Sequence, residues 1–206
     1  MENKLTFFYG PMGSAKSLRL LTMAYNFEEK NIQFIVIKPS LDTRDGETKI
    51  HSRVGLEREC VPVDKETNIY KAIKAYKNFL LAQFETLKYV LVDEAQFLTE
   101  EQINQLSDVV DFLDINVICF GLRTDFQSHL FSGSKRLFEI ADEIHRISSV
   151  CECGEHRASV NARFDENGEI ITDGEQLVIG GNEKYRAICR KCWKDKVREK
   201  ENKENG

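Results

Sequence analysis

The sequence predicts an α/β fold, in which a P-loop parallel sheet is flanked by helices and followed by a small cysteine-bearing module. Short runs of apolar, β-prone residues alternate with segments whose apolar residues recur at helical spacing. Such alternation implies parallel strands joined by right-handed crossovers. Near Val150 the pattern changes to short strands, turns and paired cysteines. We therefore expect an α/β domain over residues 1–150, a module over residues 151–193 and a disordered charged tail over residues 194–206.

The individual elements of the α/β domain follow from short-range pattern. Strands are expected at Leu5–Tyr9, Phe34–Ile37, Lys88–Val92, Val117–Gly121 and Ile144–Val150. Helices are expected over Ser17–Glu29, Ile69–Leu80 and Ile103–Leu113. The segment Leu41–Leu56 is polar, contains glycine and has no clean periodicity, so it is expected to be a mobile loop.

Composition limits the class of protein. The formal net charge is −5 and the isoelectric point is about 5.5, which argues against a general nucleic-acid binder. No apolar run is long enough to cross a bilayer. The first residues lead directly into a strand, without the pattern of a secretory signal. These features predict a cytoplasmic protein with neither nucleic-acid nor membrane partners.

The first candidate site is a turn between the first strand and the first helix. It consists of Gly10, Pro11, Met12, Gly13, Ser14, Ala15, Lys16 and Ser17. Backbone N–H groups in such a P-loop, with the helix N-terminus behind them, cradle phosphates. Lys16 would reach the β- and γ-phosphates, and the hydroxyl of Ser17 would help to hold Mg²⁺. The alternative is an ordinary turn with a solvated lysine.

Ala15 departs from the P-loop pattern, which has glycine immediately before the lysine. Alanine at a position that requires a positive φ costs about 1 kcal/mol. Gly13 preserves part of the backbone conformational freedom of this turn.

A second candidate site follows the strand Lys88–Val92, where Asp93 and Glu94 are adjacent. Ligands of open α/β sheets gather at the carboxyl ends of the strands. Asp93 is therefore expected to hold the metal, directly or through water, and Glu94 to act as a base or to position water. Two exposed acids at a strand end are the alternative.

The chain has six cysteines, and four of them fall in two close pairs. The pairs are Cys151 with Cys153 and Cys189 with Cys192. In a reducing compartment such pairs indicate a closed structural zinc site that staples a segment with little core of its own. Unpaired thiols, or His156 in place of one cysteine, are the alternatives, because the Cys-x-Cys spacing is tighter than usual.

Five segments together resemble the type II thymidine kinases, the zinc-containing cytosolic class, over about Leu5 to Trp193. They are GPMGSAKS at Gly10–Ser17, KPSLDTR at Lys38–Arg44, DEAQF at Asp93–Phe97, FGLRTDFQ at Phe120–Gln127 and IGGNEKYRAICRKC at Ile179–Cys192. The resemblance implies a RecA-like domain, a zinc-bound β-rich module and a lasso loop over roughly Phe164–Tyr185. It further implies a homotetramer that the end product, thymidine triphosphate, inhibits.

The resemblance also implies an activity, the transfer of the γ-phosphate of ATP to the 5′-hydroxyl of thymidine and of deoxyuridine in nucleotide salvage. Glu94 matches the catalytic base, and Asp42, Arg44 and Gln96 match residues near the phosphates. The positions that match the nucleoside site are Phe97, Leu98, Phe126, Phe131, Asn161, Val178, Ile179 and Tyr185. Phe126 and Phe131 fit a core equally well.

Four features depart from the family pattern, beginning with Ala15 and Gly13 in the P-loop. Ser52-Arg53 stands where Ser-His is frequent, Asn161 replaces a threonine that meets the base, and the first cysteine pair is tighter. Two other functional hypotheses remain open: a P-loop ATPase that drives a partner, and a catalytically weakened nucleotide-binding zinc protein.

Overall fold

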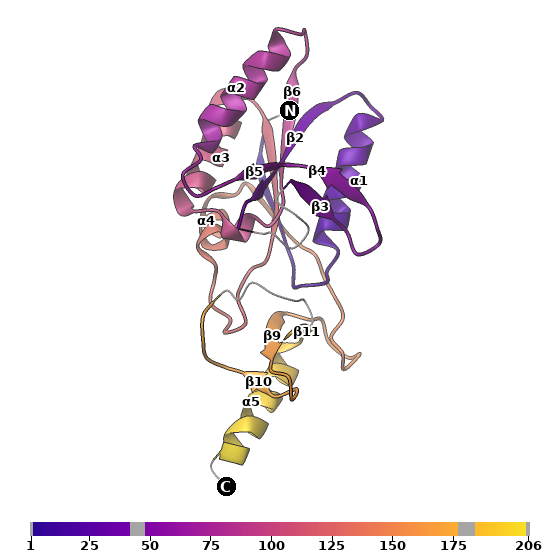
Figure 1. Cartoon of the computed structure of the whole chain (residues 1–206), viewed down its shortest axis with the longest axis vertical. Coiled ribbons are helices and arrows are strands. Elements are labelled where there is room, and N and C mark those ends of the chain that lie inside the picture. The colour runs from indigo at the N-terminus through magenta and orange to yellow at the C-terminus, as the bar shows by residue number, and fades with distance from the viewer. Residues whose placement is uncertain (1, 42–47, 177–183, 205–206) are drawn as a thin grey trace.

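The computed structural model describes residues 2–41, 48–176 and 184–204 (Figure 1). Its centre is a six-stranded parallel sheet with the strand order β5-β2-β6-β7-β1-β8. The strands are β1 (Leu5–Tyr9), β2 (Gln33–Pro39), β5 (Val61–Val63), β6 (Leu87–Val92), β7 (Asn116–Gly121) and β8 (Glu143–Arg146). Strand β7 separates β1 from β6, so the expected RecA-like α/β sheet is confirmed. The edge strand β8 ends four residues before the predicted end at Val150.

Helices cover both faces of this sheet (Figure 1). Helix α1 (Lys16–Glu28) packs on one face, while α2 (Ile69–Leu81), α3 (Glu100–Leu113) and α4 (Ser132–Ile140) pack on the other. Helix α3 begins at a capping box, in which the Thr99 hydroxyl accepts from the backbone N–H of Gln102 at 3.1 Å and the Gln102 side chain accepts from the backbone N–H of Thr99. Val90, Leu91 and Val92 of β6 are each 0% exposed, which explains the unbroken apolar run at the end of this strand.

A small antiparallel hairpin occupies part of the segment that the sequence predicted to be a loop. Strands β3 (Lys49–His51) and β4 (Glu57–Glu59) pair with Ile50 opposite Arg58. Each strand has three residues, so neither is long enough to produce a recognisable alternation. Ile50 is 1% exposed and joins the core beside α1. The loop prediction, made for Leu41–Leu56, was therefore wrong at Lys49–His51, while β4 begins just after the predicted loop.

The cysteine module follows the sheet and lies at one end of the molecule (Figure 1). It contains the three-stranded antiparallel sheet β10-β9-β11, formed by β9 (Val160–Phe164), β10 (Ile170–Ile171) and β11 (Tyr185–Ile188). Helix α5 (Arg190–Glu204) ends the described chain. The β-rich second module predicted from the sequence is confirmed.

The tail predicted to be disordered over residues 194–206 is helical through Glu204. Trp193 and Val197 lie one turn apart and pack against the small core that contains Phe164 and Ile170. Lysine, arginine and glutamate, which make up most of the rest of the segment, are good helix formers. The charge pattern that suggested disorder therefore belongs to the solvated face of a helix. No helix within the described ranges combines the length and apolarity needed to cross a bilayer.

Candidate active site

The carboxyl ends of β1 and β6 open into a cavity of about 400 Å³. The P-loop supplies much of its wall, and Asp93 and Glu94 supply another part. Lys38 near the end of β2, the hairpin β3–β4, Leu18 and Leu122 line the remainder. The structure thus brings the two candidate sites of the sequence into one cavity, as the parallel sheet requires.

The P-loop adopts the left-handed conformation at two positions. Gly13 has φ 70°, and Ala15 has φ 60° with ψ 32°. The alanine therefore occupies a backbone conformation that costs about 1 kcal/mol relative to glycine. Lys16 is 7% exposed, and its ammonium donates to the carbonyl oxygens of Pro11 at 2.9 Å and Gly10 at 3.3 Å. The positive charge is consequently held inside the turn.

Ser17, at the start of α1, contacts Asp93, which follows β6: the hydroxyl of Ser17 donates to Oδ2 of Asp93 at 3.1 Å. Burial, together with the neighbouring charge of Glu94, raises the pKa of Asp93 to about 7, although the Ser17 hydrogen bond acts in the opposite direction. Among the described residues, Oδ1 of Asp93 has no hydrogen-bond partner. A buried carboxylate oxygen beside a hydroxyl is a donor set that suits Mg²⁺.

Glu94 lies at the turn that follows β6, also in the left-handed conformation, with φ 48°. Gln96 fixes its carboxylate, because Nε2 of Gln96 donates to Oε2 of Glu94. The other end of the Gln96 amide accepts from the backbone N–H of Leu122 at 2.9 Å. Gln96 is 1% exposed, and its amide links the residue that follows β7 to the candidate base. The sequence placed Gln96 with the phosphates, whereas its side chain contacts Glu94.

Phe97, the first of the aromatic residues expected at the nucleoside site, ends the short helix η1 (Ala95–Phe97), and the others follow later in the chain. The rings of Phe97 and Phe131 meet edge to face with centroids 5.7 Å apart. Phe126 is 1% exposed and lies under the guanidinium of Arg163. Leu98 belongs to the main core, and Tyr185 pairs with Arg163 between β11 and β9. The expected site residues Asp42, Arg44, Val178 and Ile179 lie outside the described residues.

Asn161 braces the P-loop rather than pointing freely toward a ligand. Its Oδ1 accepts from the backbone N–H of Met12 at 2.8 Å, and its Nδ2 donates to the carbonyl oxygen of Thr124 at 3.1 Å. The residue is 4% exposed. The amide therefore joins β9 to two loops of the sheet domain, a role that the sequence did not indicate.

The four paired cysteines converge as expected. The sulfur atoms of Cys151, Cys153, Cys189 and Cys192 all lie within 4.8 Å of one another. Backbone N–H groups donate to two of them, from Cys189 to Cys151 at 3.0 Å and from Cys192 to Cys189 at 3.4 Å. Four thiolates that close around a tetrahedral ion are compatible with structural zinc. His156 contacts Cys153 from outside this group of four.

Sequence reasoning missed the residues that cover the P-loop from the side of β2 and the hairpin. Lys38, Ser52 and Arg53 all line the cavity. Lys38 is 1% exposed, and its ammonium donates to the carbonyl oxygen of Lys49 at 3.1 Å. The position of Lys38 at the carboxyl end of a predicted buried strand could have indicated its place at the site. For Arg53 the only sign was its departure from the frequent Ser-His pair, because nothing in the local pattern predicts the hairpin that carries it.

These features define a P-loop protein built for phosphoryl transfer: a buried lysine in the turn, a serine joined to a buried aspartate, and an oriented glutamate beside them. A family model described as thymidine kinase matches residues 3–193. The chain belongs to the thymidine kinase family.

Curated thymidine kinases match this chain over almost their whole length. The chain is 43% identical to the thymidine kinase of Mannheimia succiniciproducens over 194 residues, which are 94% of this chain and 96% of that one. It is 42% identical to the thymidine kinase of Rhodopirellula baltica, over 94% of this chain and 89% of that one. Among solved structures, the Pif1 helicase from Candida albicans covers 70% of this chain and 36% of its own at 16% identity, with a TM-score of 0.40.

Proposed function

We propose that the protein transfers the γ-phosphate of ATP to the 5′-hydroxyl of thymidine, in nucleotide salvage. The observation that carries this proposal is the joining of Ser17 to Asp93 at 3.1 Å with the oriented Glu94 beside them in one cavity. Membership of the thymidine kinase family supports it over both modules, since the match runs from residue 3 to residue 193.

The proposed mechanism assigns one task to each part of the cavity. The backbone N–H groups of the P-loop and the Lys16 ammonium bind the β- and γ-phosphates. Glu94 accepts the proton of the 5′-hydroxyl as its oxygen bonds to the γ-phosphorus and the bond from that phosphorus to ADP breaks. Gln96 holds the Glu94 carboxylate in place for this transfer. Ser17 and Asp93 would hold Mg²⁺, which when bound neutralises charge on the phosphate oxygens.

The nucleoside would lie against Phe97, Phe126, Phe131 and Tyr185, with Leu98, Asn161, Val178 and Ile179 as the remaining predicted positions. We extend the proposal to deoxyuridine as a second acceptor, to zinc at the four cysteines, and to a cytoplasmic homotetramer inhibited by thymidine triphosphate. These finer assignments rest on the resemblance to the type II class.

The test is phosphoryl transfer from labelled ATP to a panel of nucleosides, with a control that contains no nucleoside. The proposal predicts labelled product with thymidine and deoxyuridine and none with purine nucleosides. ATP hydrolysis without a labelled nucleoside would instead favour the P-loop ATPase. Inactivity of a folded protein that still binds ATP would favour the weakened nucleotide-binding protein.

A further inference from the structure

We infer that Arg53 is a cationic contact for the triphosphate of the phosphate donor, in a place that Gly13 keeps open. The inference rests on the proposed function, because it deepens the assignment of the phosphate site. It concerns two positions at which the chain departs from the family pattern, and these positions prove to be neighbours in space.

The guanidinium of Arg53 lies against the P-loop. Its Nη1 is 3.4 Å and its Cζ is 3.9 Å from the point where a Cβ atom of residue 13 would stand. Arg53 lines the same cavity as Lys16, Ser17 and Asp93. A Cβ at position 13 would already touch Nη1, and a longer side chain would displace the guanidinium. Glycine at this position therefore makes room for the arginine.

Hydrogen bonds within the tip of the hairpin β3–β4 hold the backbone that carries Arg53. The backbone N–H of Ser52 donates to the carbonyl oxygen of Leu56 at 2.8 Å, and the backbone N–H of Leu56 donates to the Ser52 hydroxyl at 3.0 Å. Gly55 at φ 87° permits the reversal of the chain. Arg53 therefore lies in a turn whose two ends are joined by hydrogen bonds between Ser52 and Leu56.

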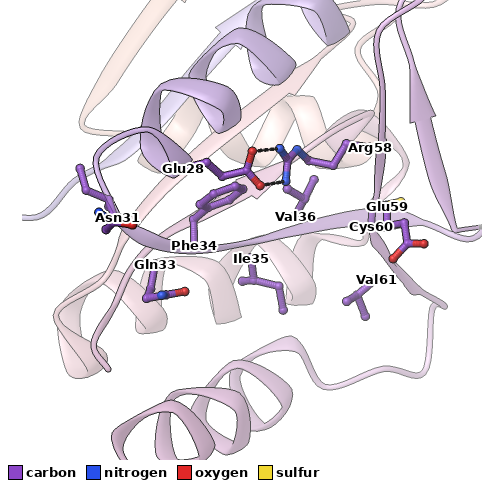
Figure 2. A pocket seen from close by; sticks show the side chains of 11 residues that line it. Glu28, Asn31, Gln33, Phe34, Ile35, Val36, Arg58, Glu59, Cys60 and Val61 are labelled. Atoms are coloured by element: carbon purple, nitrogen blue, oxygen red, sulfur yellow. Dashed lines mark hydrogen bonds and ion pairs between the residues drawn. The ribbon is translucent and has the colours of Figure 1, made fainter. Parts of the chain in front are cut away.

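The base of the hairpin is fastened to α1 and to β2. Figure 2 shows the Arg58 guanidinium paired with the Glu28 carboxylate by two hydrogen bonds, at 2.7 and 2.5 Å. The same guanidinium lies over the ring of Phe34, with 5.2 Å between Cζ and the ring centroid. Lys38 holds the other strand through the carbonyl oxygen of Lys49. These contacts fix the hairpin relative to the helix that follows the P-loop.

The chemistry of Arg53 matches phosphate rather than a protein partner. Within the described residues its guanidinium has no hydrogen bond or ion pair, although it is directed at the P-loop. A planar guanidinium binds phosphate oxygens in a bidentate manner and remains charged at every physiological pH. A nucleoside triphosphate in the P-loop would bring such oxygens into the cavity that Arg53 lines.

The test measures equilibrium binding of a non-hydrolysable ATP analogue with Mg²⁺ to the full chain. Arg53→Gln should weaken binding about tenfold, the effect of one charge-assisted contact, and Arg53→Lys should lie between this variant and the unchanged protein. Arg198→Gln removes the same charge from the exposed side of α5 and should have no effect. Unchanged binding by Arg53→Gln would overturn the inference.

A second comparison tests the pairing with Gly13. Gly13→Asn, with a residue that tolerates a positive φ, should displace Arg53 and weaken binding of the analogue. Combined with Arg53→Gln it should add little, because both changes remove the same contact. Additive losses would contradict the pairing. Binding of the analogue does not require thymidine phosphorylation, so an inactive protein that still shows the Arg53 effect would overturn the proposed function alone.

Discussion

Met12 and Asn161, 149 positions apart in the chain, are joined by a hydrogen bond of 2.8 Å from the backbone N–H of the P-loop residue to the amide oxygen. Asn161 lies on β9 of the cysteine module, and its amide also donates to the carbonyl oxygen of Thr124. The module is thereby attached directly to the turn that would bind phosphate.

Replacing Asn161 with alanine should impair the P-loop from outside it. The change leaves the N–H of Met12 and the carbonyl oxygen of Thr124 without this partner, which should cost about 1–3 kcal/mol of unfolding free energy. Denaturant unfolding and ATP binding measure the effect, and Asn167→Ala in an exposed turn is the control. Equal unfolding free energies and equal ATP affinities for the two variants would show that the hydrogen bonds of Asn161 do not support the P-loop.

Ala15→Gly should relieve the strain of the left-handed backbone at φ 60°. The expected gain in unfolding free energy is at most about 1 kcal/mol, because glycine also increases the entropy of the unfolded chain. Turnover should be preserved or raised. Denaturant unfolding and steady-state kinetics measure both quantities, and a sharp loss of activity would mean that the turn is built around the alanine methyl group.

Removal of metal from the four cysteines should unfold the second module. Trp193 is the only tryptophan of the chain and packs on the core of that module, so its fluorescence reports the change. Elemental analysis should find about one zinc per chain, lost in Cys189→Ser and retained in Cys60→Ala. Metal-free protein with unchanged Trp193 emission and full activity would contradict the structural role.

The ion pair between Glu28 and Arg58 should give a measurable acid dependence. The hydrogen bond from Arg58 lowers the pKa of Glu28 from its ordinary value of 4.5. The stabilisation is therefore fully present above that ordinary value and is lost as pH falls through the lowered pKa. The unfolding free energies of the unchanged protein and of Glu28→Gln, measured across this range, should differ near neutrality and converge in acid. A difference that persists unchanged in acid would exclude the pair as its source.

The sheet and the two catalytic segments could be predicted because their signals are local. The apolar run before Asp93 reflects a strand buried on both faces, and the Gly10–Ser17 turn carries its chemistry in consecutive residues. In a parallel sheet the carboxyl ends of the strands share one edge, which puts the P-loop and Asp93 on the same side, and Ser17 donates to Asp93 at 3.1 Å. The convergence of the cysteines follows in the same way from their paired spacing.

The missed features depend on contacts between distant segments. The hairpin β3–β4 is held in place because Ile50 packs into the core beside α1 and Arg58 pairs with Glu28. Neither contact can be predicted from the local sequence pattern. The helical tail depends on Trp193 and Val197 packing against strands earlier in the chain. The resemblance predicts a base contact for Asn161, whereas its hydrogen bond to Met12 depends on the fold, which brings the two residues together.

The most direct test of the central claim is Glu94→Gln, assayed both for phosphate transfer to thymidine and for ATP binding. The substitution keeps the size of the side chain and removes its ability to accept the hydroxyl proton. The account predicts that transfer falls by about 10²–10⁴-fold while ATP binding is unchanged. Retained transfer, or a parallel loss of ATP binding, would contradict the role of Glu94 as the base.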